Sequence, residues 1–129
     1  MLGLWGAHTA GFLLAVVAVT TPVFALPLFL VPLAWARGFG WRIPEHTDLA
    51  VYFGRCLGAF VLVLELMMLR AGLTGAYIVP IYQMLIAIAA FMVVVHIWGA
   101  VKRIQPLSET LEIGMYSGLG LLAVLFYPS

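Results

Sequence analysis

Apolar residues form four long runs along the chain, and short polar stretches separate these runs. Each run approaches the roughly 20 residues that a helix needs to cross a hydrocarbon core about 30 Å thick. The pattern predicts helices over residues 4–25, 48–69, 77–101 and 109–127. We therefore expect an all-α fold, an integral membrane four-helix bundle, formed by residues 1–129 as a single domain.

The first apolar run is too long for one crossing, because it continues towards Trp35. A straight helix of that length would extend about 47 Å at 1.5 Å per residue, which is more than one crossing and less than two. Pro22, Pro27 and Pro32 each remove a backbone hydrogen-bond donor. We expect a proline-kinked first segment that kinks or breaks near Ala25, with the remaining piece at the membrane interface.

The composition supports a membrane location and argues against a nucleic-acid partner and an internal disulfide. Hydrophobic residues make up 65% of the chain and charged residues 9%, and the mean hydropathy is +1.16. Soluble domains carry roughly 25% charged residues, so lipid is the expected solvent and partner. A net charge of +1 gives no electrostatic basis for binding nucleic acid. The single cysteine, Cys56, excludes an internal disulfide and is expected to be a buried filler.

The basic residues predict the orientation of the chain. Arg37 and Arg42 lie in the first connector, Lys102 and Arg103 lie in the third, and the middle turn holds only Arg70. By the positive-inside rule the first and third connectors are cytoplasmic, so both termini lie outside the membrane. We expect the bacterial cytoplasmic membrane.

Four polar residues form a candidate inner cluster on the cytoplasmic half. A charge near the bilayer centre costs roughly 3 kcal/mol, so such residues are usually paired or functional. Arg55, His96, Glu112 and Tyr116 lie at similar depths on three predicted helices. An Arg55–Glu112 pair is the least costly arrangement, and these four residues are candidate catalytic groups. The alternative is purely structural: the pair locks two helices together, and His96 donates one hydrogen bond.

A candidate outer cluster consists of Glu65, His8 and Gln83, which lie nearer the opposite surface. These are also candidate catalytic residues. The alternative is that the Glu65 side chain extends outward to Arg70 and the lipid headgroups. Glu65 is the less easily explained of the two buried carboxylates, because it has no helix N-terminus and no arginine at its own depth.

The positions of the histidines and methionines do not identify a cofactor. His8 and His96 fall in opposite halves, so a bis-histidine haem is not expected, whereas His96 alone could ligate a chlorophyll-like pigment. The methionines are scattered over three helices without ligand spacing, and we expect no metal site.

Two short stretches resemble a known family. Trp5-Gly6-Ala7-His8 opens the first helix, and Tyr52-Phe53-Gly54-Arg55-x-Leu57-Gly58 opens the second. Both are similar to small four-helix DoxX-like bacterial membrane proteins. The resemblance implies a compact four-helix bundle with an arginine near the start of its second helix, and it implies no catalytic residue.

Two functions are compatible with these observations, and whether the chain is an enzyme stays open. The first is a small membrane subunit that packs against partner helices, as a homo-oligomer or in a larger complex, or binds a lipid, quinone or pigment. Gly54-x-x-x-Gly58 and Gly114-x-x-x-Gly118 favour close helix packing. The second is an intramembrane acid–base enzyme, an isomerase, cyclase or hydrolase, that acts on an isoprenoid-like, sterol-like or epoxide substrate.

Overall fold

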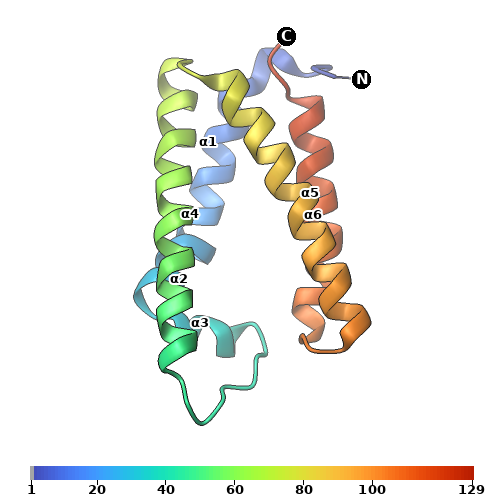
Figure 1. Cartoon of the computed structure of the whole chain (residues 1–129). Coiled ribbons are helices and arrows are strands. Elements are labelled where there is room, and N and C mark those ends of the chain that lie inside the picture. The colour runs from blue at the N-terminus through green and yellow to red at the C-terminus, as the bar shows by residue number, and fades with distance from the viewer. Residues whose placement is uncertain (1) are drawn as a thin grey trace.

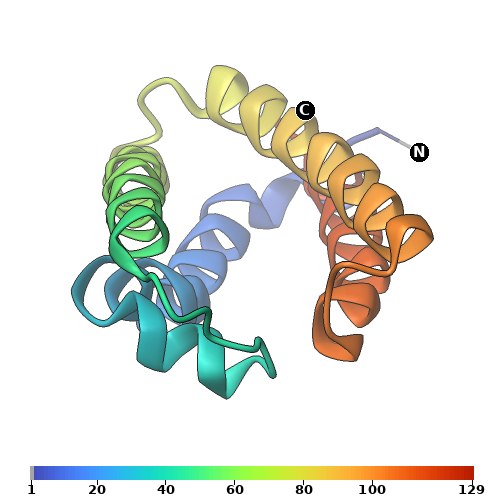
Figure 2. The same cartoon turned by 60° about the horizontal axis from the view of Figure 1, so that its bottom comes forward.

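The computed structural model describes residues 2–129, and every regular element in that range is helical. In chain order the elements are η1 (Gly6–His8), α1 (Thr9–Thr20), the π-helical η2 (Thr21–Ala25), α2 (Leu26–Leu30), α3 (Pro32–Gly38), α4 (Asp48–Thr74), α5 (Ile78–Lys102) and α6 (Leu107–Leu125). Figure 1 shows α5 and α6 as an antiparallel pair, the α5–α6 hairpin, beside a half built from α1 to α4. The two halves meet at the end that carries both termini and diverge towards the other end (Figures 1 and 2).

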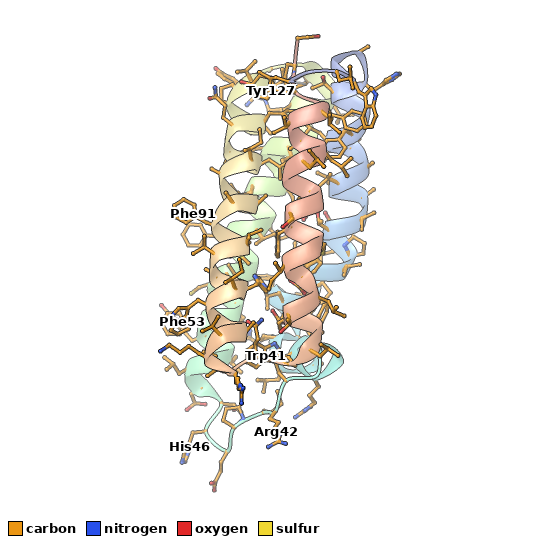
Figure 3. The ribbon with its side chains drawn as sticks, turned by 90° about the vertical axis from the view of Figure 1, so that its right-hand side faces the viewer. Trp41, Arg42, His46, Phe53, Phe91 and Tyr127 are labelled. Carbon is orange, nitrogen blue, oxygen red and sulfur yellow. The ribbon has the colours of Figure 1, made fainter. Side chains whose placement is uncertain are left out.

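Three helical segments are long and apolar enough to cross a membrane: Gly6–Leu30, Asp48–Thr74 and Ile78–Lys102. Their outward surfaces are apolar. Phe53 and Phe91, for example, are 61% and 72% exposed and project away from the other helices (Figure 3). Such surfaces are stable in lipid and costly in water, which indicates a membrane location. Helix α6 has 19 residues and does not meet the same criterion.

The proline-rich run stays helical beyond the predicted kink near Ala25. The amide of Leu26 donates to the carbonyl of Thr21, which closes a π-helical turn. Pro27 has no N–H for the carbonyl of Val23, and the indole of Trp35 donates to that oxygen at 2.9 Å instead. The chain turns only at Val31, ahead of Pro32, so the first span ends at residue 30 rather than 25.

The remaining helix bounds follow from their caps. Helix α4 continues five residues beyond the predicted end at residue 69, because Gly75 adopts the left-handed conformation (φ +72°) and its amide caps the carbonyl of Ala71. Helix α5 ends at Lys102, and α6 begins directly after Pro106. These two helices lie within two residues of their predicted bounds.

The apolar core lies at the end where the two halves meet. Its buried members come from α1, α4, α5 and α6: Leu13, Met68, Ala71, Ile81, Tyr82, Leu85 and Ala123. The Tyr82 hydroxyl donates to the carbonyl of Thr9 at 2.8 Å. The N-terminal segment is joined to α6 by backbone hydrogen bonds from Gly3 to Val124 and from Trp5 to Leu125. These contacts fasten the halves together far from the diverging end.

The two Gly-x-x-x-Gly motifs have different surroundings. A methyl group on Gly58 would lie 2.5 Å from the amide nitrogen of Phe29, and one on Gly54 would lie 2.7 Å from a side-chain atom of Pro32. The α4 motif therefore packs within the chain. By contrast, the described part of the chain places no atom within 4 Å of such a methyl group on Gly114 or Gly118.

Candidate functional site

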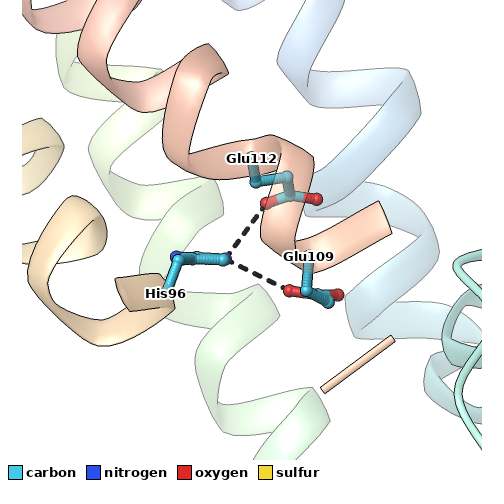
Figure 4. A group of neighbouring side chains, drawn as sticks. All are labelled: His96, Glu109 and Glu112. Carbon is cyan, nitrogen blue, oxygen red and sulfur yellow. Dashed lines mark hydrogen bonds and ion pairs between the residues drawn. The ribbon is translucent and has the colours of Figure 1, made fainter. Parts of the chain in front are cut away.

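A buried cluster of His96, Glu109 and Glu112 lies at the turn of the α5–α6 hairpin (Figure 4). The turn brings them together, because His96 lies near the end of α5 and the glutamates lie one turn apart near the start of α6. Gln105 holds the turn closed: its amide donates to the carbonyl of His96 at 3.0 Å and to the hydroxyl of Thr110 at 3.1 Å.

The imidazole of His96 faces both carboxylates with one nitrogen. Its Nε2 lies 3.1 Å from Glu109 Oε2 and 3.3 Å from Glu112 Oε2. Its Nδ1 lies 2.7 Å from the carbonyl oxygen of Met92, so Nδ1 carries a proton and donates. A neutral imidazole would then direct the Nε2 lone pair at two anionic oxygens. A cation between these atoms, either a second proton or a metal ion, removes that repulsion.

The connector at residues 39–47 packs against the hairpin turn beside the cluster. The indole of Trp41 donates to Glu109 Oε1 at 2.8 Å, and the hydroxyl of Ser108 donates to the carbonyl of Phe39. Trp41 lies beside the hairpin turn, whereas Arg42 and His46 project outward from the same connector (Figure 3). The three clustered residues are consequently only 4–9% exposed.

The electrostatic environment favours negative charge but does not neutralise two carboxylates. Glu109 lies in the first turn of α6, where the exposed backbone N–H groups carry partial positive charge. Within the described residues, Glu112 Oε1 is buried and has no hydrogen-bond partner. The cluster therefore has unused capacity to bind a proton or a cation, and it could also transfer a proton.

The predicted inner cluster forms only in part. His96 and Glu112 are in contact, and the ring of Tyr116 lies 5.2 Å from the His96 ring. The predicted pairing of Arg55 with Glu112 is wrong: Arg55 is exposed on α4, in a groove of about 500 Å3 that also contains Asp48. The two halves diverge towards the end of the molecule that holds the cluster, and Arg55 lies on α4, in the other half (Figure 1).

Glu109 and Trp41 are site residues that the sequence reasoning did not select. A usable signal was present in the i, i+3 spacing of Glu109 and Glu112, which places both carboxylates on one face of α6. A tight turn after a helix containing His96 then predicts that the three meet. Nothing in the pattern identified Trp41, because the connector has no regular periodicity.

The predicted outer cluster does not form. Glu65 is 5% exposed and accepts a hydrogen bond from the hydroxyl of Thr21 in the π-helical turn, so it does not extend towards Arg70. His8 is exposed, and Gln83 donates to the hydroxyl of Tyr127 at 3.3 Å. Glu65 stays a candidate functional carboxyl, with Thr21 as its neighbour.

An apolar groove of about 240 Å3 runs between α5 and α6 next to the cluster. Ala89, Ala90 and Gly120 keep it open, and Ser117 adds a hydroxyl. Tyr116 lines this groove and also contacts His96, so it connects the two features.

No protein-family model, curated protein or solved structure matches the chain. The resemblance to DoxX-like proteins therefore stays a prediction from sequence.

Proposed function

We propose that the chain is a small integral membrane protein that crosses the membrane four times and holds a hydrophobic molecule in the α5–α6 groove. The observation that carries this proposal is the position of Tyr116, which lines an apolar groove on one side and contacts His96 on the other. A lipid or quinone fits this arrangement, because its apolar chain can lie in the groove while its polar head lies near His96.

The size of the groove favours a chain over a large ring. Its volume of about 240 Å3 is below the roughly 300–1,000 Å3 of pockets that enclose whole drug-sized ligands. A segment of an acyl or isoprenoid chain fits such a groove, and the rest of the molecule would remain in the bilayer. A pigment held by His96 is disfavoured, because one ring nitrogen faces Met92 and the other faces the glutamates.

Membrane topology is part of the proposal. Helix α6 packs antiparallel against α5, which supports a fourth span despite its two glutamates. The first and third connectors lie at the same end of the molecule and hold four of the six basic residues, which supports a cytoplasmic location for that end.

A pair of matched substitutions tests the groove. Ala90 and Ala87 are both exposed on α5, but only Ala90 lines the groove. We expect mass spectrometry of the gently purified wild-type protein to detect a retained lipid or quinone. Ala90→Phe should reduce its occupancy at least tenfold, whereas Ala87→Phe should leave it unchanged. Equal retention in both variants, or co-purification of a partner subunit in place of a small molecule, contradicts the proposal.

A second candidate function is intramembrane acid–base catalysis, which the contact of His96 Nε2 with two carboxylates favours. Such a group can accept a proton from one part of a substrate and return it to another. The substrate class would be isoprenoid-like, sterol-like or an epoxide. Loss of turnover of an added isoprenoid epoxide in Glu112→Gln, with groove occupancy retained, would support this function. Turnover unchanged by Glu112→Gln would exclude it.

A further inference from the structure

We propose that His96, Glu109 and Glu112 bind a divalent transition-metal ion such as Zn2+. Each residue supplies one donor atom, and the three donor atoms lie within 4.8 Å of one another. This site is separate from the α5–α6 groove and does not depend on the hydrophobic molecule proposed above.

The distances between the donor atoms match a metal site. Atoms that bind a tetrahedral ion at about 2.1 Å lie about 3.4 Å apart. His96 Nε2 lies 3.1 Å from the oxygen of Glu109 and 3.3 Å from that of Glu112. The two carboxylate oxygens lie within 4.8 Å of each other, so side-chain rotation can bring all three atoms around one ion.

The surrounding hydrogen bonds orient the ligands as they do in known metal sites. A metal-binding imidazole usually donates its other N–H to a carbonyl or carboxylate, which directs the free lone pair at the ion. His96 does so through Nδ1 and the carbonyl of Met92. The Oε1 atom of Glu109 is held by the indole of Trp41, which leaves Oε2 facing His96.

Charge and burial also favour an ion of charge +2. A neutral imidazole and two carboxylates carry a charge of −2 in a site that is at most 9% exposed. A second proton on His96 would still leave an uncompensated negative charge, and uncompensated charge is costly in a buried site. Glu112 Oε1 has no partner among the described residues, so it could become a second ligand of the same ion.

The donor set narrows the choice of metal. An imidazole with carboxylates suits Zn2+ and neighbouring first-row ions better than Ca2+ or Mg2+, which prefer oxygen ligands. Three protein ligands leave at least one coordination position for water or another small ligand, as in catalytic zinc sites.

The direct test uses the full-length protein in detergent. After treatment with a chelator, the protein is equilibrated with buffered Zn2+, and bound zinc is measured by elemental mass spectrometry. We expect one ion per chain. X-ray absorption of the zinc-loaded wild-type protein should show a shell of nitrogen and oxygen neighbours near 2.0–2.1 Å that includes a single imidazole. This second measurement needs no variant.

Matched variants assign the ion to the cluster. Glu112→Gln and His96→Gln should each weaken zinc binding at least 100-fold, since each removes a ligand. Glu45→Gln and His46→Gln are the controls, because both residues are exposed in the connector and should leave binding unchanged. Helical circular dichroism and gel filtration identify any variant that has not folded.

Three results overturn the proposal: no zinc retained by the wild-type protein, binding that Glu112→Gln does not weaken, or a spectrum with more than one imidazole. The proposed function fails independently. Ala90→Phe should block the groove without changing zinc binding, and retention of the hydrophobic molecule can be measured on metal-free protein.

Discussion

Replacing Trp41 with phenylalanine should lower both the stability of the protein and its affinity for Zn2+, because it removes a hydrogen bond to the buried cluster. The membrane-facing surface should not change. The indole donates a 2.8 Å hydrogen bond to Glu109 Oε1, and phenylalanine keeps the aromatic ring but removes the donor. Hydrogen bonds to charged groups contribute about 1.5–3 kcal/mol. Trp41 is 36% exposed, so water can replace part of the lost bond and the lower end applies. We expect the loss of this hydrogen bond to cost about 1.5 kcal/mol, which is roughly a tenfold change in an equilibrium constant.

Two assays measure the effect of losing this hydrogen bond. The free energy of unfolding of the metal-free protein in detergent should fall by about 1.5 kcal/mol. The affinity for Zn2+ should fall roughly tenfold, as for other residues that orient metal ligands. Trp98→Phe is the matched control, because Trp98 is 57% exposed on α5 and donates to no described residue. If Trp41→Phe and Trp98→Phe have the same free energy of unfolding and the same zinc affinity, the hydrogen bond from Trp41 does not stabilise the cluster.

Two further substitutions test the packing of the first half of the chain. Gly58→Ala should lower the free energy of unfolding by about 1–2 kcal/mol, because the new methyl group would meet the backbone of Phe29; Gly114→Ala, with open space, should not. Thr21→Val should cost about 1–3 kcal/mol, because it leaves the buried carboxyl of Glu65 without its hydroxyl partner. The first prediction is contradicted if Gly58→Ala and Gly114→Ala have the same melting temperature. The second is contradicted if Thr21→Val leaves the melting temperature unchanged.

The position of a residue along its helix could be predicted from the sequence, but which helices are neighbours at that position could not. A rise of 1.5 Å per residue places His96, Glu112 and Tyr116 at one level, and a tight turn between their helices makes them neighbours. The same reasoning placed Arg55 at that level. It failed because contact also requires the helices to be adjacent, and the two halves diverge there.

The neighbour of Glu65 was missed for a different reason. Prolines predict helix breaks through the donors they lack, so the first helix was expected to end near Ala25. The indole of Trp35 satisfies one of the freed carbonyls, and the helix continues through a π-helical turn. That turn places Thr21 against Glu65, a contact between residues 44 positions apart that no local pattern contains.

The position of the core implies that the His96 cluster is not needed to hold the fold together. The apolar core joins the halves at the opposite end, with Tyr82 and the N-terminal segment, and Gln105 closes the hairpin turn independently. Beside the cluster, the halves are linked within the described residues only through the connector, by the hydrogen bonds of Trp41 and Ser108. Buried ionic groups are often replaceable by apolar side chains with no loss of stability, or with a gain of about 1–4 kcal/mol. A cluster that stabilises little and costs desolvation is better explained by binding.

The combined variant His96→Leu, Glu109→Leu and Glu112→Leu separates these explanations. Its metal-free form should unfold with a free energy within about 2 kcal/mol of wild type, or higher, because the loss of two acidic side chains near the start of α6 costs about 0.3–1 kcal/mol each, and removal of the buried charges offsets the lost hydrogen bond from Trp41. Zinc binding should be abolished. Reversible unfolding in detergent, followed by circular dichroism, measures the first quantity. A decrease of more than about 2 kcal/mol would mean that the cluster is an interhelical lock, since the loss would then exceed what the helix terminus accounts for.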